Sequence, residues 1–337
     1  MAPRLLILRA GPGTTIQDRG RYGYLRFGVT TAGPMDWISQ ARANGLAGNP
    51  QGAGAIEVGV GGIELAVEGG VVAIGYAGAP FEVSRNGTAL PSAGRVRLGA
   101  GDRLTVRPAA HGSWLYLSVA GGLSVTPVMG SVATSLRTGI GPAPLAAGDV
   151  FPLHQVADLP ETACDTGWPT VAAPLRVVLG PQHDCFSARG LDTFLGEPYR
   201  ISRRSDRMGY RLEGTPVEHA NGFNIVSDAI ALGAVQVPGD GLPIVLMADH
   251  QPTGGYPKLA HVIRADIGRL AQCRPGEAVR FTPITVEAAR TELLAALHAL
   301  RAMPGRAMPS DPPNLSSEHL LSINLISGVS GIFDQTG

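Results

Sequence analysis

Lysine is almost absent from this sequence. The 337 residues include 27 lysines and arginines, and Lys258 is the one lysine among them. Arginine is a planar, permanently charged fork, whereas lysine is a compact ammonium whose pKa burial can lower, so the two residues are not interchangeable in chemistry. Lys258 ends the segment TGGYPK, residues 253–258. Chance is one explanation for a single lysine and a chemical role is the other, and the surrounding residues bear on the choice.

Net charge, cysteine and long apolar runs are also lacking. The 27 acidic residues balance the 27 basic ones, which disfavours binding to nucleic acid or to an anionic membrane. The three cysteines are widely spaced without a CxxC pair, so we expect neither a disulfide framework nor a zinc site. The apolar run at residues 5–8 is too short for a signal peptide, and no later run is long enough to span a membrane. We therefore expect a soluble, cytoplasmic protein.

Glycine and proline, in contrast, are abundant along the whole chain. The 46 glycines and 27 prolines interrupt short runs that are rich in β-branched residues. Many short strands separated by turn residues are typical of β-barrels and β-sandwiches. We therefore expect a mainly β fold with a few short helices: strands at residues 63–67, 71–74, 103–106 and 244–247, and helices at residues 35–46, 187–195 and 286–302.

The two halves of the sequence resemble each other. Five similarities occur in the same order, pairing residues 2–12 with 173–181, 17–28 with 205–214, 54–65 with 228–237, 71–74 with 244–247, and 101–108 with 276–283. Such an ordered repeat predicts two related β domains, residues 1–156 and residues 174–302, joined around residues 157–174. The alternative is a coincidence of Gly-Pro and Gly-Asp turns.

The composition changes after residue 302. Residues 303–337 begin with prolines and polar residues, which predict a linker. The linker leads to an apolar piece, residues 319–333. This piece is either a short docking segment or a frayed terminus.

Three stretches combine charge and glycine in patterns too particular for a scaffold alone. Residues 14–49 contain QDRGRYG and GPMD and end in ANGLAGN, residues 205–212 read SDRMGYRL, and residues 253–258 read TGGYPK. At these residues the chain resembles the carboxyltransferase-like family. That family includes the C subunit of bacterial 5-oxoprolinase, the second half of the allophanate-hydrolase-type carboxyltransferase domain of urea carboxylase, and an antagonist of a sporulation-kinase inhibitor. The resemblance covers residues 5–281.

The resemblance implies a pair of cyclophilin-like β-barrel domains, in agreement with the internal repeat. It also implies one component of a heteromeric 5-oxoprolinase that uses ATP to convert 5-oxo-L-proline to L-glutamate, together with A-like and B-like partner proteins. Two alternatives exist within the family. One is the carboxyltransferase component of a biotin-dependent urea or amide carboxylase, and the other is a non-enzymatic regulator that binds a B-like partner. The fold does not decide among them.

The TGGYPK segment supplies the first candidate site residues. Its glycines allow backbone N–H groups to approach an anion closely, and its lysine adds a point charge. No GxxxxGK[ST] sequence is present, so nucleotide binding does not follow from the sequence. We expect Lys258 to be catalytic, against phosphate oxygens in an oxoprolinase or against the ureido carbonyl of biotin in a transferase, with Asp18 or Asp249 in proton handling. Further substrate contacts are expected from Thr253, Gly254, Gly255 and Tyr256.

The N-terminal stretch supplies two more candidates for substrate binding, Arg21 and Asp36. Each has a structural alternative, because Asp18 and Arg21 can brace a Gly-rich turn, and Asp36 lies where a helix dipole favours a carboxylate. The histidines are not spaced with other ligands in a metal pattern, so we expect no metal site.

Arg207 and Arg211 are the candidates in the central stretch. They are four residues apart in a strand-like segment, so we expect both on one face. There they either bind a substrate carboxylate or pair with Asp206 and Glu213.

Overall fold

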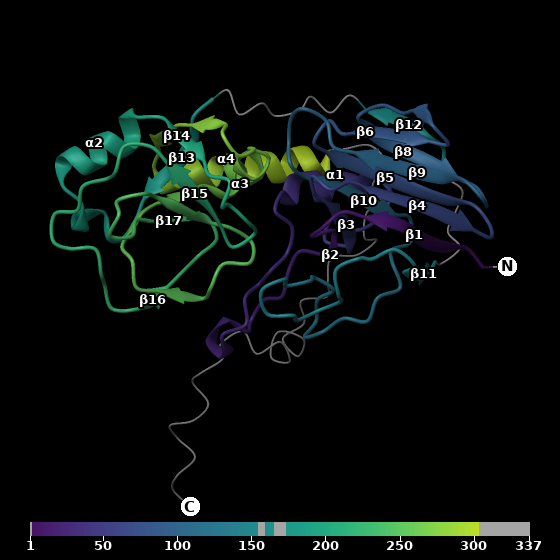
Figure 1. Ribbon diagram of the computed structural model, residues 1–337, viewed down its shortest axis with the longest axis horizontal. Helices are drawn as coiled ribbons and strands as arrows, with labels where there is room; N and C mark the ends of the chain where they lie inside the picture. Colours follow the sequence, from purple (N-terminus) through teal and green to yellow (C-terminus); the bar gives the residue numbers. More distant parts are fainter. Residues whose placement is uncertain (1, 154–158, 165–172, 303–337) are drawn as a thin grey trace, which may run out of the picture. The chain divides into compact units, whose positions relative to one another are not determined.

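Short strands make up most of the chain (Figure 1). The computed structural model describes residues 2–153, 159–164 and 173–302, which all fall within one compact unit. We call residues 2–164 the N-terminal half and residues 173–302 the C-terminal half. Two sheets are built from the first half, and a larger sheet and a two-stranded ribbon from the second. The expected mainly β fold with a few short helices is confirmed.

The two sheets of the N-terminal half enclose an apolar core. Strand β1, Arg4–Ala10, alternates buried with less buried residues, as expected of a sheet that has one face on a core. Leu5 and Ile7 of β1 join residues of the second sheet, such as Val96, in one buried cluster. The first sheet has the order β11 (Val150–Pro152), β1, β4 (Ile63–Glu68), β9 (Arg103–Arg107), β6 (Glu82–Arg85) and β7 (Thr88–Ala89); the second has the order β12 (Thr162–Cys164), β8 (Ala93–Leu98), β5 (Val72–Gly78), β10 (Leu115–Val119), β3 (Ala55–Val58) and β2 (Thr15–Gln17).

The large sheet of the C-terminal half curves into a nearly closed barrel. Its two edge strands follow one another in the chain with only Arg280 between them, so the two edges of the sheet must lie close together. Closing a sheet in this way removes exposed strand edges. The order is β21 (Ala278–Val279), β14 (Tyr199–Ile201), β15 (Gly209–Glu213), β18 (Ile244–Leu246), β17 (Ala234–Gln236), β20 (Lys258–Val262), β13 (Leu175–Leu179) and β22 (Phe281–Pro283); β16 (Asp228–Ala229) and β19 (Thr253–Gly254) form the separate ribbon.

Helices occupy the region where the halves meet. Helix α1 (Trp37–Leu46) packs on β5 and β10 and also contacts α3 (Arg264–Ala271) and α4 (Val286–Arg301), as seen in Figure 1. Gly75 of β5 lets α1 approach closely, because an added Cβ would lie 2.4 Å from the carbonyl oxygen of Ala43. Helix α2 (Ala188–Gly196) and the 3-10 turns η1 (Leu25–Phe27) and η2 (His183–Cys185) complete the described elements.

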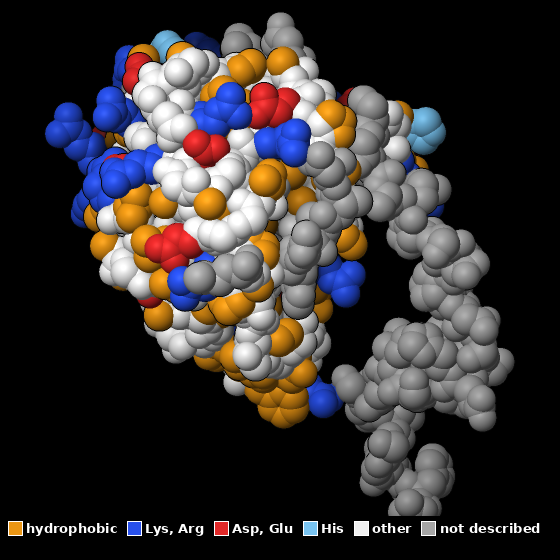
Figure 2. All heavy atoms as spheres, turned by 90° about the vertical axis from the view of Figure 1, so that its right-hand side faces the viewer, with side chains coloured by type: hydrophobic (Ala, Val, Ile, Leu, Met, Phe, Trp, Pro, Cys, Tyr) orange, Lys and Arg blue, Asp and Glu red, His pale blue; other side chains and the backbone are white. Residues whose placement is uncertain are grey.

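One face of the N-terminal half carries charges of both signs (Figure 2). Cross-strand partners Arg4 and Glu68 form an ion pair of 2.9 Å between β1 and β4, and Arg103 reaches Glu64 at 3.4 Å. Exposed pairs of this kind contribute little stability. They do place opposite charges next to each other on this face.

Two elements of the structure were missed from the sequence. Helix α3 was not expected, because Gly268 in its interior weakens the helical pattern. The segment expected to join the halves contains strand β12, which pairs with β8. The predicted linker and apolar piece at residues 303–337 lie outside the described residues. The domain boundaries, and the relation of the two halves by a repeat, stay predictions.

Candidate functional site

A buried ion cluster joins the two halves. Arg207, between β14 and β15, donates to both carboxylate oxygens of Asp249, with distances of 3.0 and 3.1 Å from Nε and Nη2. Its Nη1 forms an ion pair with Glu57 of β3, and its Nη2 also donates to the carbonyl oxygen of Gly33 at 2.7 Å. All three charged side chains are at most 5% exposed. We call Glu57, Arg207 and Asp249 the junction cluster.

Burial and paired charges compete in setting the pKa values of the junction cluster. Burial raises the pKa of Glu57, while the charge of Arg207 and hydrogen bonds from the Tyr116 hydroxyl and the Met35 N–H, at 2.7 and 2.8 Å, oppose the rise. Burial acts to lower the pKa of Arg207, but the charges of Glu57 and Asp249 outweigh it and hold that pKa above its usual value. In each of its three hydrogen bonds Glu57 is the acceptor, as an ionised carboxylate must be because it has no hydrogen to donate.

Asp36 and Gln272 form a second polar link between the halves. Asp36 caps α1 by accepting from the Ser39 N–H at 3.1 Å, and it also accepts from Gln272 Nε2 at 2.9 Å. The side-chain oxygen of Gln272 accepts from the N–H groups of Ser113 and Trp114, both at 2.9 Å. Asp36 therefore caps the N-terminus of α1, in line with the structural alternative given for it from the sequence. Its role in substrate binding stays a prediction.

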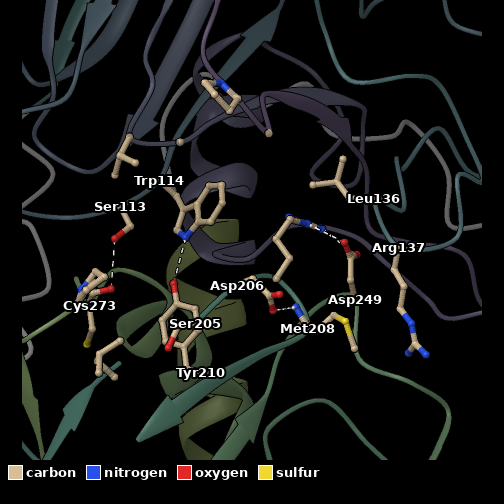
Figure 3. Close-up of a pocket in the computed structure, with 17 residues that line it drawn as sticks. Ser113, Trp114, Leu136, Arg137, Ser205, Asp206, Met208, Tyr210, Asp249 and Cys273 are labelled. Carbon is tan, nitrogen blue, oxygen red and sulfur yellow. Dashed lines mark hydrogen bonds and ion pairs between the residues drawn. The ribbon is translucent and has the colours of Figure 1, made fainter. Parts of the chain in front are cut away.

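A cavity of about 480 Å³ lies between the halves, next to the junction cluster (Figure 3). The volume is typical of small-molecule sites, which span about 300–1,000 Å³. Both halves contribute to its walls, and the indole Nε1 of Trp114 meets the hydroxyl of Tyr210 at 3.4 Å across it. The lining is mostly apolar, with few polar groups: Ser113, Arg137, Ser205, Asp206, Arg207 and Asp249.

Arg137 is the basic side chain of this cavity that has no hydrogen-bonding or ionic partner among the described residues. It is exposed, whereas Arg207 is buried and already engaged. Figure 3 places Leu136 and Arg137 on one side of the cavity and Trp114 on the other. A free guanidinium at the edge of an apolar cavity can bind a carboxylate bidentately.

Lys258 lies in a different part of the C-terminal half. Its side chain is 3% exposed, and its Nζ contacts Oδ2 of Asp228 at 2.6 Å, while the side chain of Asp228 is 49% exposed. The hydrogen bond from Lys258 lowers the pKa of Asp228. Gln182 braces the pair by accepting from the Lys258 N–H at 3.2 Å and donating to Asp228 at 3.2 Å. Lys258 does not line the cavity of the junction.

The preceding residues of the TGGYPK segment form a tight ribbon. Thr253 and Gly254 pair with β16, and Tyr256 is 40% exposed. The carbonyl oxygen of Gly255 accepts from the Ile225 N–H at 2.9 Å. Because Asp228 belongs to β16, this pairing places Thr253 and Gly254 next to the ion pair of Lys258 and Asp228. The roles of the segment's residues in substrate binding stay predictions.

We expect Gly254→Ala to lower the free energy of unfolding by about 1 kcal/mol, the lower end of the usual cost of overpacking, because the atoms that it would meet are the ends of two buried side chains. An added Cβ would lie 2.6 Å from Ile230 Cδ1 and 2.8 Å from Gln236 Nε2. Gly255→Ala is the matched control, because its nearest neighbour, the carbonyl oxygen of Ile225, is 3.4 Å away. Urea unfolding measures both variants. Equal losses would contradict the close packing at Gly254.

Asp18 and Arg21 both brace the loop at residues 128–133. Asp18 accepts from Ser131 Oγ at 2.6 Å and from the Val132 N–H at 2.9 Å. Arg21 is 1% exposed and donates to the carbonyl oxygens of Val128 and Ala133 at 3.0 and 2.9 Å. These contacts match the bracing alternative, and the structure does not bring the two residues into the junction cavity.

The expectation that Arg207 and Arg211 share one face was wrong. Arg207 lies in the turn before β15, where Asp206 accepts from the Met208 N–H at 2.8 Å, whereas Arg211 lies within β15. Arg207 is consequently buried and Arg211 is exposed. Of the two alternatives for these arginines, pairing with Asp206 and Glu213 does not hold for Arg207, whose partners are the two acids of the junction cluster.

The described part of the chain offers neither a metal cluster nor a membrane helix. No group of three or more His, Cys, Asp and Glu residues there lies together in a way that would hold a metal ion. No described helix combines the length and apolar character needed to cross a bilayer. The three cysteines are free.

The sequence matches a known family of protein domains. Residues 27–283 match the family model described as carboxyltransferase domain, subdomain A and B. The match takes in most of the chain, so the protein belongs to this family, and the resemblance noted from its motifs is confirmed.

The relatives within the family include two kinds of enzyme. The C subunit of 5-oxoprolinase from Escherichia coli strain K12 is 37% identical over 289 residues, which cover 85% of this chain and 93% of that protein. Urea amidolyase of Saccharomyces cerevisiae is 29% identical over 306 residues, which cover 83% of this chain but 17% of that protein. The crystal structure of the Kluyveromyces lactis urea carboxylase matches with a TM-score of 0.82 and 27% identity, over 92% of this chain and 30% of that chain. The chain thus corresponds to nearly all of the oxoprolinase C subunit and to one part of the urea enzymes.

Four residues of the site were missed from the sequence. Glu57 had a detectable signal, because it is a lone charge within the apolar strand AIEV. Tyr116, Gln272 and Arg137 had none, since a tyrosine in a strand, a glutamine after a helix and an arginine in a loop are common everywhere.

Proposed function

We propose that this chain is the C-type subunit of a heteromeric 5-oxoprolinase, which converts 5-oxo-L-proline to L-glutamate with ATP. The observation that carries the proposal is the 37% identity to the Escherichia coli C subunit over 93% of that protein. The name of this relative implies further subunits, and we propose A-like and B-like partners. A soluble, cytoplasmic location is part of the same proposal.

The junction cavity is the proposed substrate pocket. The ring of 5-oxoproline would pack against the apolar wall that includes Val60, Trp114 and Met208. Its carboxylate would bind Arg137, the free guanidinium at the edge. Asp249 is the proposed proton-handling group, because Arg207 holds both of its oxygens in a fixed orientation beside the cavity.

ATP does not fit the junction cavity. Arg207 already uses its donors on Glu57, Asp249 and Gly33. The rest of the described lining offers one cation, Arg137, and one exposed carboxylate, Asp206, which would repel a phosphate. A triphosphate needs several cations or backbone donors against its oxygens. We therefore route no step through ATP in this cavity, and the ATP dependence is proposed for the assembled complex.

We expect Arg137→Met to raise the KM for 5-oxoproline about 10-fold to 100-fold in the reconstituted complex. The loss of one charge-assisted hydrogen bond costs about 1.5–3 kcal/mol, and ground-state and transition-state binding of the carboxylate should fall together. Arg189→Met, at an exposed position of α2 away from the cavity, is the control and should keep the normal KM. An unchanged KM in Arg137→Met would remove Arg137 from the substrate pocket.

A second candidate function is the carboxyltransferase step of a biotin-dependent urea or amide carboxylase. The TM-score of 0.82 to the urea carboxylase over 92% of this chain favours it. Apolar walls with a few polar groups also suit the bicyclic ring of biotin.

Reconstitution distinguishes these functions. The chain is co-expressed with candidate A-like and B-like partners, and glutamate formation from 5-oxoproline is measured with and without ATP. The proposal requires ATP-dependent glutamate formation that stops when this chain is omitted. Carboxyl transfer from biotin without oxoproline hydrolysis would favour the second function. Partner binding without either activity would favour the regulator.

A further inference from the structure

A second cavity, of about 330 Å³, lies beside the Gly-rich loop of the N-terminal half, and the proposed function does not use it. We call it the basic cavity. Its described lining contains no carboxylate and includes two arginines. The polar members of the lining are Arg19, Tyr22, Thr31, His250 and Arg264, and Leu25, Ala32, Pro34, Ile230, Ala231 and Leu232 complete the wall.

Arg264 is held in place without a counter-ion. Its guanidinium lies 5.4 Å from the ring centre of Trp37, and its carbonyl oxygen accepts from the Trp37 indole at 3.0 Å. Among the described residues it forms no ion pair. Burial lowers the pKa of this guanidinium, and the nearby Tyr22 and Asp36 only partly oppose the effect. A partly desolvated cation without an ionic partner is costly unless a ligand supplies the missing charge.

Arg19 contributes a second cation to the same cavity. Its stem packs on Gly52, where an added Cβ would lie 3.3 Å from Arg19 Cδ. Its guanidinium has no hydrogen-bonding or ionic partner within the described chain. The neighbouring carboxylate of Asp18 is engaged by the loop at residues 131–132, and that of Asp36 by Ser39 and Gln272. Neither carboxylate neutralises the two arginines.

His250 and Tyr22 are the remaining titratable groups of the basic cavity. His250 is 3% exposed, and burial lowers its pKa, which favours the neutral ring. Its Nδ1 donates to the carbonyl oxygen of Gln251 at 2.7 Å, so its Nε2, which has no described partner, is an acceptor that suits the hydroxyl of a hydrogen phosphate. Tyr22 also lines the cavity and is 61% exposed. Ala32, another lining residue, has a φ of 51°, a left-handed conformation that is rare for a residue with a Cβ.

We propose that the basic cavity binds a phosphate group. Two guanidinium groups match the charge of a phosphate dianion and present planar pairs of donors to its oxygens. A single carboxylate would leave one of the two arginines uncompensated. The phosphate group belongs either to free inorganic phosphate or to a nucleotide, and both share the chemistry that the cavity recognises.

Isothermal titration calorimetry of the full chain, without any partner, tests the proposal with inorganic phosphate as the probe. We expect saturable binding that acetate at equal concentration does not displace. In parallel titrations, ATP that binds more tightly than phosphate while adenosine does not bind would identify a nucleotide as the source. ATP that binds no more tightly than phosphate would identify free phosphate. No saturable phosphate binding, or full displacement by acetate, would overturn the proposal.

Two variants locate the phosphate at the basic cavity. Arg264→Met and Arg19→Met each remove one charge-assisted contact and should weaken phosphate binding about tenfold or more. Arg189→Met, on exposed helix α2, is the control and should bind as the unchanged chain does. Arg19 is exposed, so its variant keeps the test decisive if Arg264→Met fails to fold. Unchanged binding in Arg19→Met would overturn the assignment.

Discussion

Arg207→Met is expected to lower the free energy of unfolding by about 3–5 kcal/mol, the usual cost of removing one partner from a buried ion pair. The variant leaves Glu57 and Asp249, which are 0% and 2% exposed, as buried negative charges without their cation. It also removes the contact between the halves that Arg207 makes with Gly33. Guanidinium unfolding followed by circular dichroism measures the loss.

Two further variants make this prediction specific. Arg211→Met, four residues away in an exposed position, should change stability by no more than about 0.5 kcal/mol. The triple variant Arg207→Met, Glu57→Gln, Asp249→Asn should recover part of the loss, because it removes the unpaired charges. An Arg207→Met protein as stable as the unchanged chain would show that the junction cluster does not hold the halves together.

Lys258 lies outside the proposed substrate pocket, so a catalytic role for it would be exerted at a separate site, against the ATP that the assembled complex is proposed to use. In that role, Lys258→Met is expected to lower turnover of the reconstituted complex about 10²-fold to 10³-fold, the typical loss for one positioned electrostatic contact. Its melting temperature should hardly change. The methionine side chain keeps much of the apolar stem in its buried place, and the abandoned Asp228 is 49% exposed and stays hydrated. Differential scanning calorimetry and the coupled assay are run on the same preparation.

Asp228→Asn separates a catalytic lysine from a structural one. This change removes the ionic partner but leaves the ammonium, so a lysine that acts on substrate should retain much of its activity. If the ion pair is the whole purpose of Lys258, the two variants should behave alike. Lys258→Arg should also lose activity, because a wider planar head does not fit the buried position. Full oxoprolinase activity and full carboxyl transfer in Lys258→Met would make the lysine a bystander.

Local sequence patterns predicted much of the fold. Helices α1, α2 and α4 and strands β4, β5, β9 and β18 lie where the turn residues and apolar patterns placed them. Helix α3 was missed because its interior glycine is required by a contact distant in sequence: an added Cβ at Gly268 would lie 2.4 Å from Asp36 Oδ1. Propensity within a window cannot register such a contact.

The candidate site was predictable as a set of residues but not as an arrangement. Arg207 and Asp249 were both named, yet their partner Glu57 comes from the other half of the chain. The one-face expectation for Arg207 and Arg211 assumed that the strand begins earlier than it does. Because Arg207 lies before the strand, the two-residue alternation of a strand does not apply to it, and the sequence alone does not fix where the strand begins.

The near-closure of the C-terminal barrel through Arg280 has a consequence for the order of folding. Strand β13 opens this half, yet its edge is covered only by β22, where Leu175 pairs with Phe281. During synthesis the barrel therefore cannot close until nearly all of its residues have been made, and pairings so distant in sequence form slowly. Glu57 is synthesised long before Arg207, so before the barrel closes Glu57 lacks the buried cation with which it pairs in the final structure. We expect the N-terminal half to acquire its final packing around Glu57 only after the ribosome has released the last strand of the barrel.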